Sequence, residues 1–433
     1  MSQPMPTPES ANPTAQPRLG VVGETVNPEV AHSTQPKGPP ETIWLIGIST
    51  GGFEELGLKA QTTLRQADVI VGTWRQLNML PDSLHGERHP WPAPQDRDLE
   101  GLFREFQGRN VAVLASGDPM FYGAGPAIVK ALGMHRLEII PAASSASLAC
   151  ARLGWALDRT PIASLATDPV ETLIPLVESG MRFLVLGKDE FTTAAIAKLL
   201  TKLGHGAAKL KVLSDLGSSD EEFSEGTAAQ PPAAVSALNV IAVEPVPGIP
   251  LTRHHELDAD LKALIVAALK PTPGATLWSV GEPSGNIATD WLRAAGIIKG
   301  SRAQAVCFES APDRATQISK HASSAGVPWL KVVTATPITA KALKDIRFEQ
   351  GPIAATPDAI YLGKAVVNEL LTETAWMLLR PGGIIIASAT TPEEITKLEE
   401  FQMRFGGELK HLQLGELKLS QWRARKPLSP TAV

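Results

Sequence analysis

The residues VAVLASGDPMFYG at 111–123 decide the fold class. Their first four residues are continuously apolar, which is typical of a strand buried on both faces of a parallel sheet. Gly117 ends the strand and lets a ligand approach the backbone, because it has no side chain. Asp118 then lies at the carboxyl edge of the sheet, where open α/β folds bind ligands, and Pro119 restricts the backbone after it. Taken alone, Gly-Asp-Pro is explained better as an ordinary strand-to-helix turn.

Similar apolar runs alternate with helical patterns along the rest of the chain. This alternation predicts an α/β fold with mainly parallel strand pairing. The Pro-rich segment 245–250 divides the pattern and is predicted to be a linker. We predict strands at 42–47, 68–72, 111–116, 137–140, 182–186, 211–213 and 236–243 before it, and at 275–281, 303–308, 330–333, 359–362 and 383–387 after it.

The chain has 433 residues, which is too many for one ordinary core, so two or three domains are expected. Residues 1–40 are rich in Pro, Thr, Ser and Gln and lack an apolar period, which predicts a disordered tail. They contain no apolar segment of a signal peptide. We therefore expect α/β domains at 41–246 and 247–425, with a short tail at 426–433.

The composition argues against several classes of protein. The formal net charge of −5 is unusual for a general nucleic-acid binder, and no apolar run reaches the roughly 18 residues that span a bilayer. The two cysteines, Cys150 and Cys307, lie far apart, so we expect no disulfide framework and a cytoplasmic location. The nine histidines form no metal-ligand spacing, so we expect no metal site. A small-molecule substrate is the simplest partner.

Seven strings of the sequence resemble, in order, the precorrin-6Y C(5,15)-methyltransferase (decarboxylating) family of cobalamin biosynthesis. Several strings in the right order are more specific than one glycine loop. The resemblance extends over about residues 41–425. The first half contains ADVIVGTWRQL, VAVLASGDPMFYGAG, IIPAASSASLACARLGW and LGSSDEEFSEGT, and the second half contains LKPTPGATLWSVG, PDAIYLG and LLRPGGIII.

The resemblance implies two S-adenosylmethionine-dependent methyltransferase domains. The first would have the two-lobed tetrapyrrole methylase fold, in which the lobes clasp the cofactor. The second would have a Rossmann-like class I methyltransferase fold. The implied reaction is methylation of precorrin-6Y at meso carbons 5 and 15, with decarboxylation of an acetate side chain. The family also implies a tetrapyrrole substrate and a possible homo-oligomer.

The resemblance also implies cofactor-binding residues in the first domain. Ser144 and Ser145 would lie beside the cofactor at the next strand end, where hydroxyls and helix-terminal N–H groups hold a carboxylate. A plain helix cap explains these serines equally well. The residues implied to line the cofactor pocket are Gly117, Asp118, Pro119 and Met120.

Arg75 is a candidate for binding a substrate carboxylate, because guanidinium and carboxylate form two parallel hydrogen bonds. A surface arginine is an equally good interpretation. In the second half, Gly281 lies in the glycine-loop position, and Glu309 follows the next strand. The resemblance implies that Glu309 accepts hydrogen bonds from the cofactor's ribose. The alternative for Glu309 is a solvated loop carboxylate.

The sequence departs from the family pattern mostly in loops. In the first domain, Ser49 and Thr50 replace Gly and Pro of the first glycine loop. Further departures there are Ala166, Thr167, Gly187 and Lys188. In the second domain, the departures are Ser279 for an acid, Pro283 for a glycine, and Thr336, Lys364 and Ser388; a Thr-Lys pair expected near Leu257-Asp258 is also missing. We therefore hypothesise that the second domain binds S-adenosylmethionine weakly or not at all.

Methyl transfer from a sulfonium to a nucleophilic carbon requires alignment more than a covalent nucleophile. No catalytic residue is assigned by the sequence. Three alternatives to the double methylation remain open. In the first, only the N-terminal domain is active and transfers one methyl group. In the second, the protein is a non-catalytic relative that binds a tetrapyrrole or the cofactor. A nucleotide-linked oxidoreductase is disfavoured, because no G-x-G-x-x-G opens a helix after either leading strand.

Overall fold

A computed structural model describes residues 42–91, 99–247, 259–296, 302–335, 338–344, 356–414 and 417–428. The tail predicted at 1–40 and most of the segment between the two halves lie outside the described residues. In the described part of the chain, no helix combines the length and apolar character that crossing a membrane requires.

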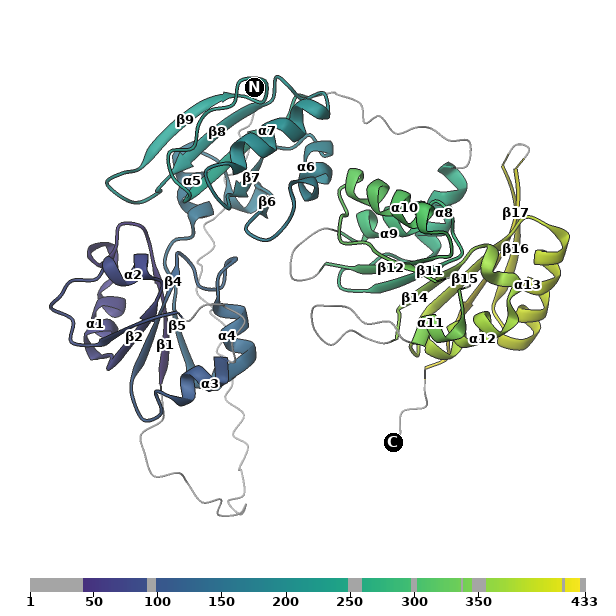
Figure 1. Cartoon of the computed structure of the whole chain (residues 1–433), viewed down its shortest axis with the longest axis horizontal. Helices are drawn as coiled ribbons and strands as arrows, with labels where there is room; N and C mark the ends of the chain where they lie inside the picture. Colours follow the sequence, from purple (N-terminus) through teal and green to yellow (C-terminus); the bar gives the residue numbers. More distant parts are fainter. Residues whose placement is uncertain are drawn as a thin grey trace, which may run out of the picture. The chain divides into compact units, whose positions relative to one another are not determined.

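The first sheet has five strands in the order β3-β2-β4-β1-β5, and all of its pairings are parallel. The continuously apolar strands are buried, as the sequence predicted. Figure 1 shows this sheet and the helices around it. The strands are β1 (Ile43–Ile48), β2 (Val69–Gly72), β3 (Glu87–Pro90), β4 (Val111–Ser116) and β5 (Leu137–Ile140). The helices around this sheet are α1 (Leu58–Gln66), α2 (Trp74–Asn78), α3 (Leu99–Arg104) and α4 (Gly125–Leu132).

Parallel pairings predominate in this half of the chain, as predicted, but the second sheet is mostly antiparallel. Its order is β6-β7-β10-β8-β9, and only the β6–β7 pairing is parallel. The connection from β8 to β9 is short, and a short connection between paired strands returns the chain antiparallel. The strands are β6 (Ile162–Ser164), β7 (Phe183–Leu186), β8 (Lys209–Ser214), β9 (Glu222–Thr227) and β10 (Asn239–Glu244). The helices are α5 (Ser145–Leu153), α6 (Ile174–Glu178) and α7 (Thr192–Lys202).

The second half of the chain forms a seven-stranded sheet in the order β13-β12-β11-β14-β15-β17-β16. Five strands are parallel, as expected, and the unpredicted β16–β17 hairpin adds an antiparallel edge. The parallel strands are β11 (Thr276–Val280), β12 (Gln304–Glu309), β13 (Lys331–Thr334), β14 (Ala359–Leu362) and β15 (Ile384–Ala389), and the hairpin strands are β16 (Glu408–Leu414) and β17 (Leu417–Arg425).

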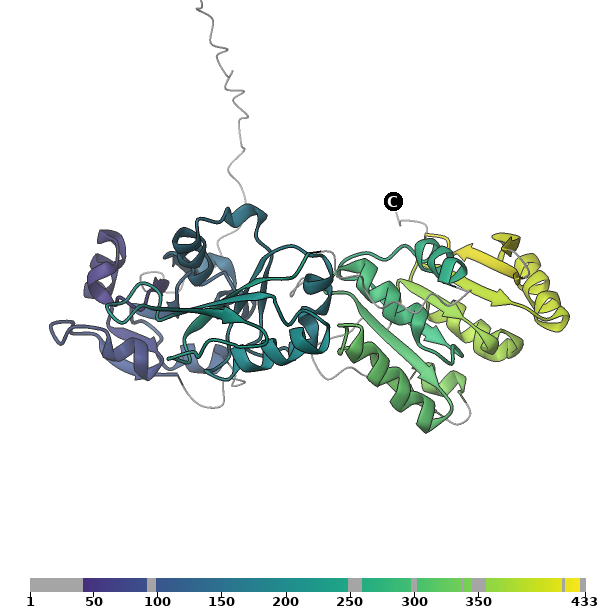
Figure 2. The same ribbon diagram turned by 90° about the horizontal axis from the view of Figure 1, so that it is seen from above.

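Helices cover both faces of this sheet, and a separate apolar core lies on each face (Figure 2). Trp291 belongs to one core and Trp278 and Trp422 to the other, and all three side chains are fully buried. The helices are α8 (Ala259–Ala268), α9 (Asn286–Ala295), α10 (Pro312–Ser324), α11 (Ala340–Lys344), α12 (Glu369–Leu378) and α13 (Pro392–Phe405). Single 3-10 turns lie at Phe53–Glu55, Met134–Arg136, Leu157–Arg159, Val170–Leu173 and Lys364–Val367.

Candidate functional site

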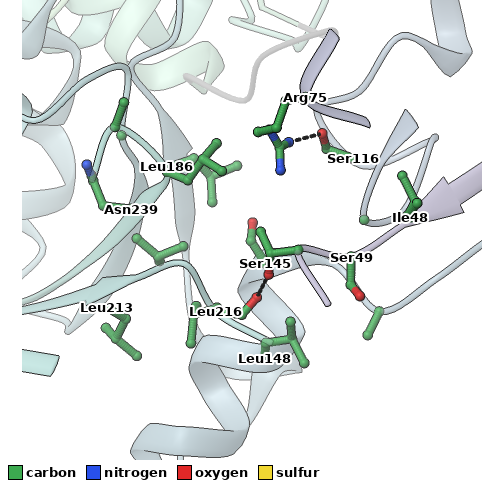
Figure 3. Close-up of a pocket in the computed structure, with 17 residues that line it drawn as sticks. Ile48, Ser49, Arg75, Ser116, Ser145, Leu148, Leu186, Leu213, Leu216 and Asn239 are labelled. Atoms are coloured by element: carbon green, nitrogen blue, oxygen red, sulfur yellow. Dashed lines mark hydrogen bonds between the residues drawn. The ribbon is translucent and has the colours of Figure 1, made fainter. Parts of the chain in front are cut away.

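A cavity of about 180 Å³ is lined by residues of both the first and the second sheet regions (Figure 3). One side is polar and comes from the ends of β1 and β4 and from α2. The other side is mainly apolar and comes from α5 and the strands of the second sheet. The polar side contributes Ser49, Thr50, Arg75, Ser116 and Gly117, and the apolar side contributes Leu148, Leu186, Leu213, Leu216, Leu238 and Val240. The cavity therefore suits a ligand that has both polar and apolar parts.

Gly117 lies in the cavity wall immediately after β4, as the sequence predicted for the strand end. Its φ of +60° is in the left-handed region, which favours glycine. A Cβ atom at this position would lie 3.2 Å from the Ala143 carbonyl oxygen and 3.3 Å from the Ser144 Cα. The end of β4 and the loop before α5 can therefore approach this closely only because residue 117 has no side chain.

The next three residues form a turn beside the cavity, but they are not among its lining residues. The Asp118 carboxylate accepts a hydrogen bond from the Met120 backbone N–H at 2.9 Å. Pro119 is buried, and Met120 is exposed. The structure thus assigns Asp118 a local turn contact, and cofactor binding by Asp118, Pro119 and Met120 stays a prediction.

The two serines at the start of α5 have different surroundings. Ser144 is buried, and its hydroxyl caps the helix by accepting a hydrogen bond from the Ser147 N–H at 3.1 Å. This confirms the helix-cap interpretation for Ser144. Ser145 lines the cavity, so its hydroxyl can reach a ligand there.

Arg75 lies at the polar edge of the cavity, at the position that Figure 3 labels. Its Nη2 donates a hydrogen bond to the Ser116 hydroxyl at 3.1 Å, and the Gln76 side-chain amide donates to the same oxygen at 3.1 Å. Burial lowers the pKa of the Arg75 guanidinium, and the Asp215 carboxylate opposes that shift. The residue is solvent-exposed, yet its guanidinium faces the cavity, so it remains available to an anionic group.

Thr50 is a cavity residue whose contact the sequence did not predict. Its hydroxyl donates a hydrogen bond to the Leu216 backbone carbonyl, at 2.5 Å, and so connects the loop after β1 to the segment after β8. The sequence identified Thr50 only as a departure from a family pattern. The partner is 166 residues away, so no local signal identifies it.

Replacing Thr50 with valine is expected to destabilise the first half of the chain. The change leaves the Leu216 carbonyl without its donor, and losing such a bond costs about 0.5–1.5 kcal/mol. A thermal unfolding scan is expected to show a midpoint lowered by about 2–4 °C. Thr50→Ser keeps the hydroxyl and serves as the control. Equal midpoints for the valine and serine variants would show that the bond contributes nothing.

Gly281 and Glu309 lie at the carboxyl edge of the seven-stranded sheet, as predicted. Glu309 is only 3% exposed, so the solvated-carboxylate alternative is wrong. Its Oε1 accepts hydrogen bonds from Arg314 Nη2 at 2.7 Å and from the Ala311 N–H at 2.8 Å. Burial by itself raises the pKa of Glu309, but these hydrogen bonds outweigh it, and the pKa is lowered. The carboxylate is thus held by α10, and ribose binding stays a prediction.

Glu282 is a buried carboxylate next to Gly281 that the sequence did not single out. One oxygen, Oε2, accepts a hydrogen bond from the Ser279 hydroxyl at 3.0 Å. The other, Oε1, accepts hydrogen bonds from the Ser284 hydroxyl at 2.8 Å and from the Ile287 N–H at 3.0 Å. Burial raises the pKa of Glu282. The only sequence signal that could have pointed to Glu282 was the departure of this segment from the composition of a glycine loop.

The remaining predictions concern metal ligands, the two cysteines and the other departures from the family pattern in the second domain. Within the described part of the chain, no cluster of three or more His, Cys, Asp or Glu residues could hold a metal ion. Both cysteines are free and buried. Thr336 and the pair Leu257-Asp258, which the sequence identified as departures, lie outside the described residues, as does the side chain of Lys364.

Comparisons with known proteins divide the chain into two matched regions. Residues 42–232 match the family model described as tetrapyrrole (corrin/porphyrin) methylases, and residues 255–431 match the precorrin methyltransferase domain. The first region contains most of the residues that line the cavity, and the second contains the Glu282 loop.

Whole-chain relatives span both regions. The precorrin-6Y C(5,15)-methyltransferase (decarboxylating) of Mycobacterium tuberculosis (strain CDC 1551 / Oshkosh) is 34% identical over 90% of this chain and 99% of that protein. A protein of the same name from Sinorhizobium sp. is 31% identical over 89% of this chain and 95% of that protein. The crystal structure of the C-terminal domain of precorrin-6Y C5,15-methyltransferase from Rhodobacter capsulatus is 27% identical, covers 40% of this chain and 92% of that chain, and has a TM-score of 0.33.

Proposed function

Because this chain belongs to the precorrin-6Y C(5,15)-methyltransferase (decarboxylating) family, we propose that it methylates precorrin-6Y at C5 and C15 and decarboxylates an acetate side chain. It is a methyltransferase of cobalamin biosynthesis that uses a methyl donor. We propose that the donor is S-adenosylmethionine. The observation that carries the proposal is the cavity beside Gly117, which is lined mainly by residues of the tetrapyrrole methylase region and combines polar and apolar walls.

The residues of the cavity fit this donor. The leucines of the apolar side, such as Leu148, Leu213 and Leu216, suit the flat adenine ring. The Ser145 hydroxyl, at the first turn of α5, suits the donor's carboxylate. The missing side chain at Gly117 lets the loop before α5 lie against the end of β4, and both segments contribute to the cavity wall. Asp118, Pro119, Met120 and Ser144 are proposed as supporting residues because they adjoin this wall in sequence.

The proposed mechanism depends on positioning. Bound S-adenosylmethionine supplies an electrophilic methyl group on a sulfonium. The cavity walls hold the donor in one orientation, and Arg75 binds an acidic side chain of the tetrapyrrole and so places the ring. Alignment of this kind contributes roughly 7–11 kcal/mol to such reactions. No residue of this chain needs to form a covalent bond with the substrate.

We also propose that the two domains divide near residue 247. The end of one matched region at 232 and the start of the other at 255 support this boundary. A cytoplasmic location and homo-oligomer formation stay predictions.

Mass spectrometry of precorrin-6Y incubated with the protein and S-adenosylmethionine tests the proposed function. We expect a product with two added methyl groups and one carbon dioxide lost. One added methyl group without loss of carbon dioxide would indicate that only the first domain is active. An unchanged substrate mass, with the donor shown to be intact, would support a non-catalytic binding protein instead.

A further inference from the structure

The loop at residues 281–285 connects β11 to α9 at the carboxyl edge of the seven-stranded sheet. The sheet order places β12 on one side of β11 and β14 on the other, so the chain changes direction across the sheet at β11. Open α/β folds bind their ligands at such switch points. In this chain, the same position contains a carboxylate of the protein itself, that of Glu282.

The Glu282 carboxylate has the contacts that a bound anion would make there. It accepts a hydrogen bond from the Ile287 N–H at 3.0 Å. This N–H lies in the first turn of α9, where the N–H groups lack an intrahelical partner. The Ser279 hydroxyl donates a hydrogen bond to Oε2 at 3.0 Å, and the Ser284 hydroxyl donates one to Oε1 at 2.8 Å. The residue is only 6% exposed, so these contacts are shielded from water. A ligand that needs these donors must displace the carboxylate.

The ends of the flanking strands lie close to this loop. Glu309, at the end of β12, is held by Arg314 and by the Ala311 N–H. On the β14 side, the Gly363 N–H donates a hydrogen bond to the Val280 carbonyl at 2.9 Å. A Cβ atom added at Gly281 would lie only 2.7 Å from the Ala365 Cβ. The ends of β11 and β14 therefore pack directly against each other beside the Glu282 loop.

We propose that Glu282 acts as an internal ligand that competes with the methyl donor in the C-terminal domain, so the folded chain binds one donor molecule tightly, in the N-terminal cavity, and a second one only weakly. This inference rests on the proposed function, because it takes S-adenosylmethionine to be the donor. Glu282 is then the residue that determines how tightly the C-terminal domain holds its donor. Removing its carboxylate frees the Ile287 N–H and both serine hydroxyls for the donor.

Isothermal titration of the full chain with S-adenosylhomocysteine, the demethylated donor, tests the proposal. We expect one molecule bound tightly per wild-type chain and two per Glu282→Gly chain. Glu394→Gly is the matched control, because Glu394 is a helix-capping carboxylate of the same domain that accepts hydrogen bonds from the Thr390 and Thr391 N–H groups. The control is expected to bind one molecule tightly. Two molecules bound equally tightly to the wild-type chain, or only one bound tightly to a folded Glu282→Gly chain, would overturn the proposal.

A second variant tests the proposal even if Glu282→Gly does not fold. Gly117→Val distorts the wall of the N-terminal cavity, so it is expected to abolish the tight binding of S-adenosylhomocysteine. One molecule still bound tightly to this variant would place a donor in the C-terminal domain and contradict the inference alone. An absence of binding to the wild-type chain would instead contradict the proposed function, and the inference with it.

Discussion

A Gly117→Val variant is expected to lose at least about a hundredfold in affinity for S-adenosylhomocysteine, a change of about 2.7 kcal/mol in binding free energy. The valine side chain would enter a wall where even a single added Cβ atom would lie only 3.2 Å from the Ala143 carbonyl oxygen. A β-branched residue is also disfavoured at the φ of +60° that Gly117 adopts, and such strain costs about 1–3 kcal/mol. Relief of this strain displaces the strand end that forms the cavity. Titration calorimetry measures the loss directly.

Gly154→Val is the matched control for this prediction. Gly154 ends α5 with a φ of +65°, and no atom lies within 4 Å of the Cβ position there. The control therefore introduces similar backbone strain at a site that does not line the cavity. It is expected to lower the unfolding temperature and to keep its donor affinity. If both variants lose donor affinity equally, strain in the domain explains the effect and Gly117 has no direct role.

An Arg75→Ala variant is expected to raise the KM for the tetrapyrrole substrate about ten- to hundredfold. Hydrogen bonds to a charged group contribute about 1.5–3 kcal/mol, and the alanine removes the guanidinium that faces the cavity. Affinity for S-adenosylhomocysteine is expected to change little, because Arg75 is proposed to bind the substrate. Steady-state kinetics at saturating donor, together with calorimetry, separates these two effects.

Arg65→Ala is the control for the arginine prediction. Arg65 lies on α1, where its guanidinium packs 5.2 Å from the centre of the Phe53 ring, and it is not among the cavity residues. Its removal is expected to leave both KM and donor affinity unchanged. Arg75→Lys keeps the charge but loses the paired hydrogen bonds, so an intermediate KM is expected. A wild-type KM in Arg75→Ala would show that this arginine binds no substrate group.

The buried strands were predicted well because burial leaves a local trace in the sequence. The strand at Val111–Ser116 is continuously apolar and fully buried apart from its last residue. By contrast, β9 (Glu222–Thr227) is mostly polar and partly exposed, so no apolar run identifies it. The direction of strands leaves no such trace. A run of buried apolar residues does not indicate whether its strand is parallel or antiparallel to its neighbours. The antiparallel pairing of β10 with β7 and β8 was missed for this reason.

The candidate site was predicted in part, for a related reason. Gly117, Ser145 and Arg75 were identified from motif positions, and all three line the cavity. The apolar side of the cavity was not predicted, because leucines in strands and helices are expected in any core. Cofactor binding by all of the predicted residues stays a prediction. The contacts of Glu282 and Thr50 depend on how loops close, and no motif encodes them.

The sequence by itself determined the α/β alternation, the order of the two domains and the strand end at Gly117. These features depend on local properties, namely the period of apolar residues and the backbone freedom of glycine. Only the tertiary structure decided that Arg75 meets Ser116 across 41 residues and that Thr50 meets Leu216 across 166. It also decided that the Glu282 carboxylate turns inward. Such contacts depend on which strands become neighbours and how their connecting loops pack, and these are properties of the whole fold.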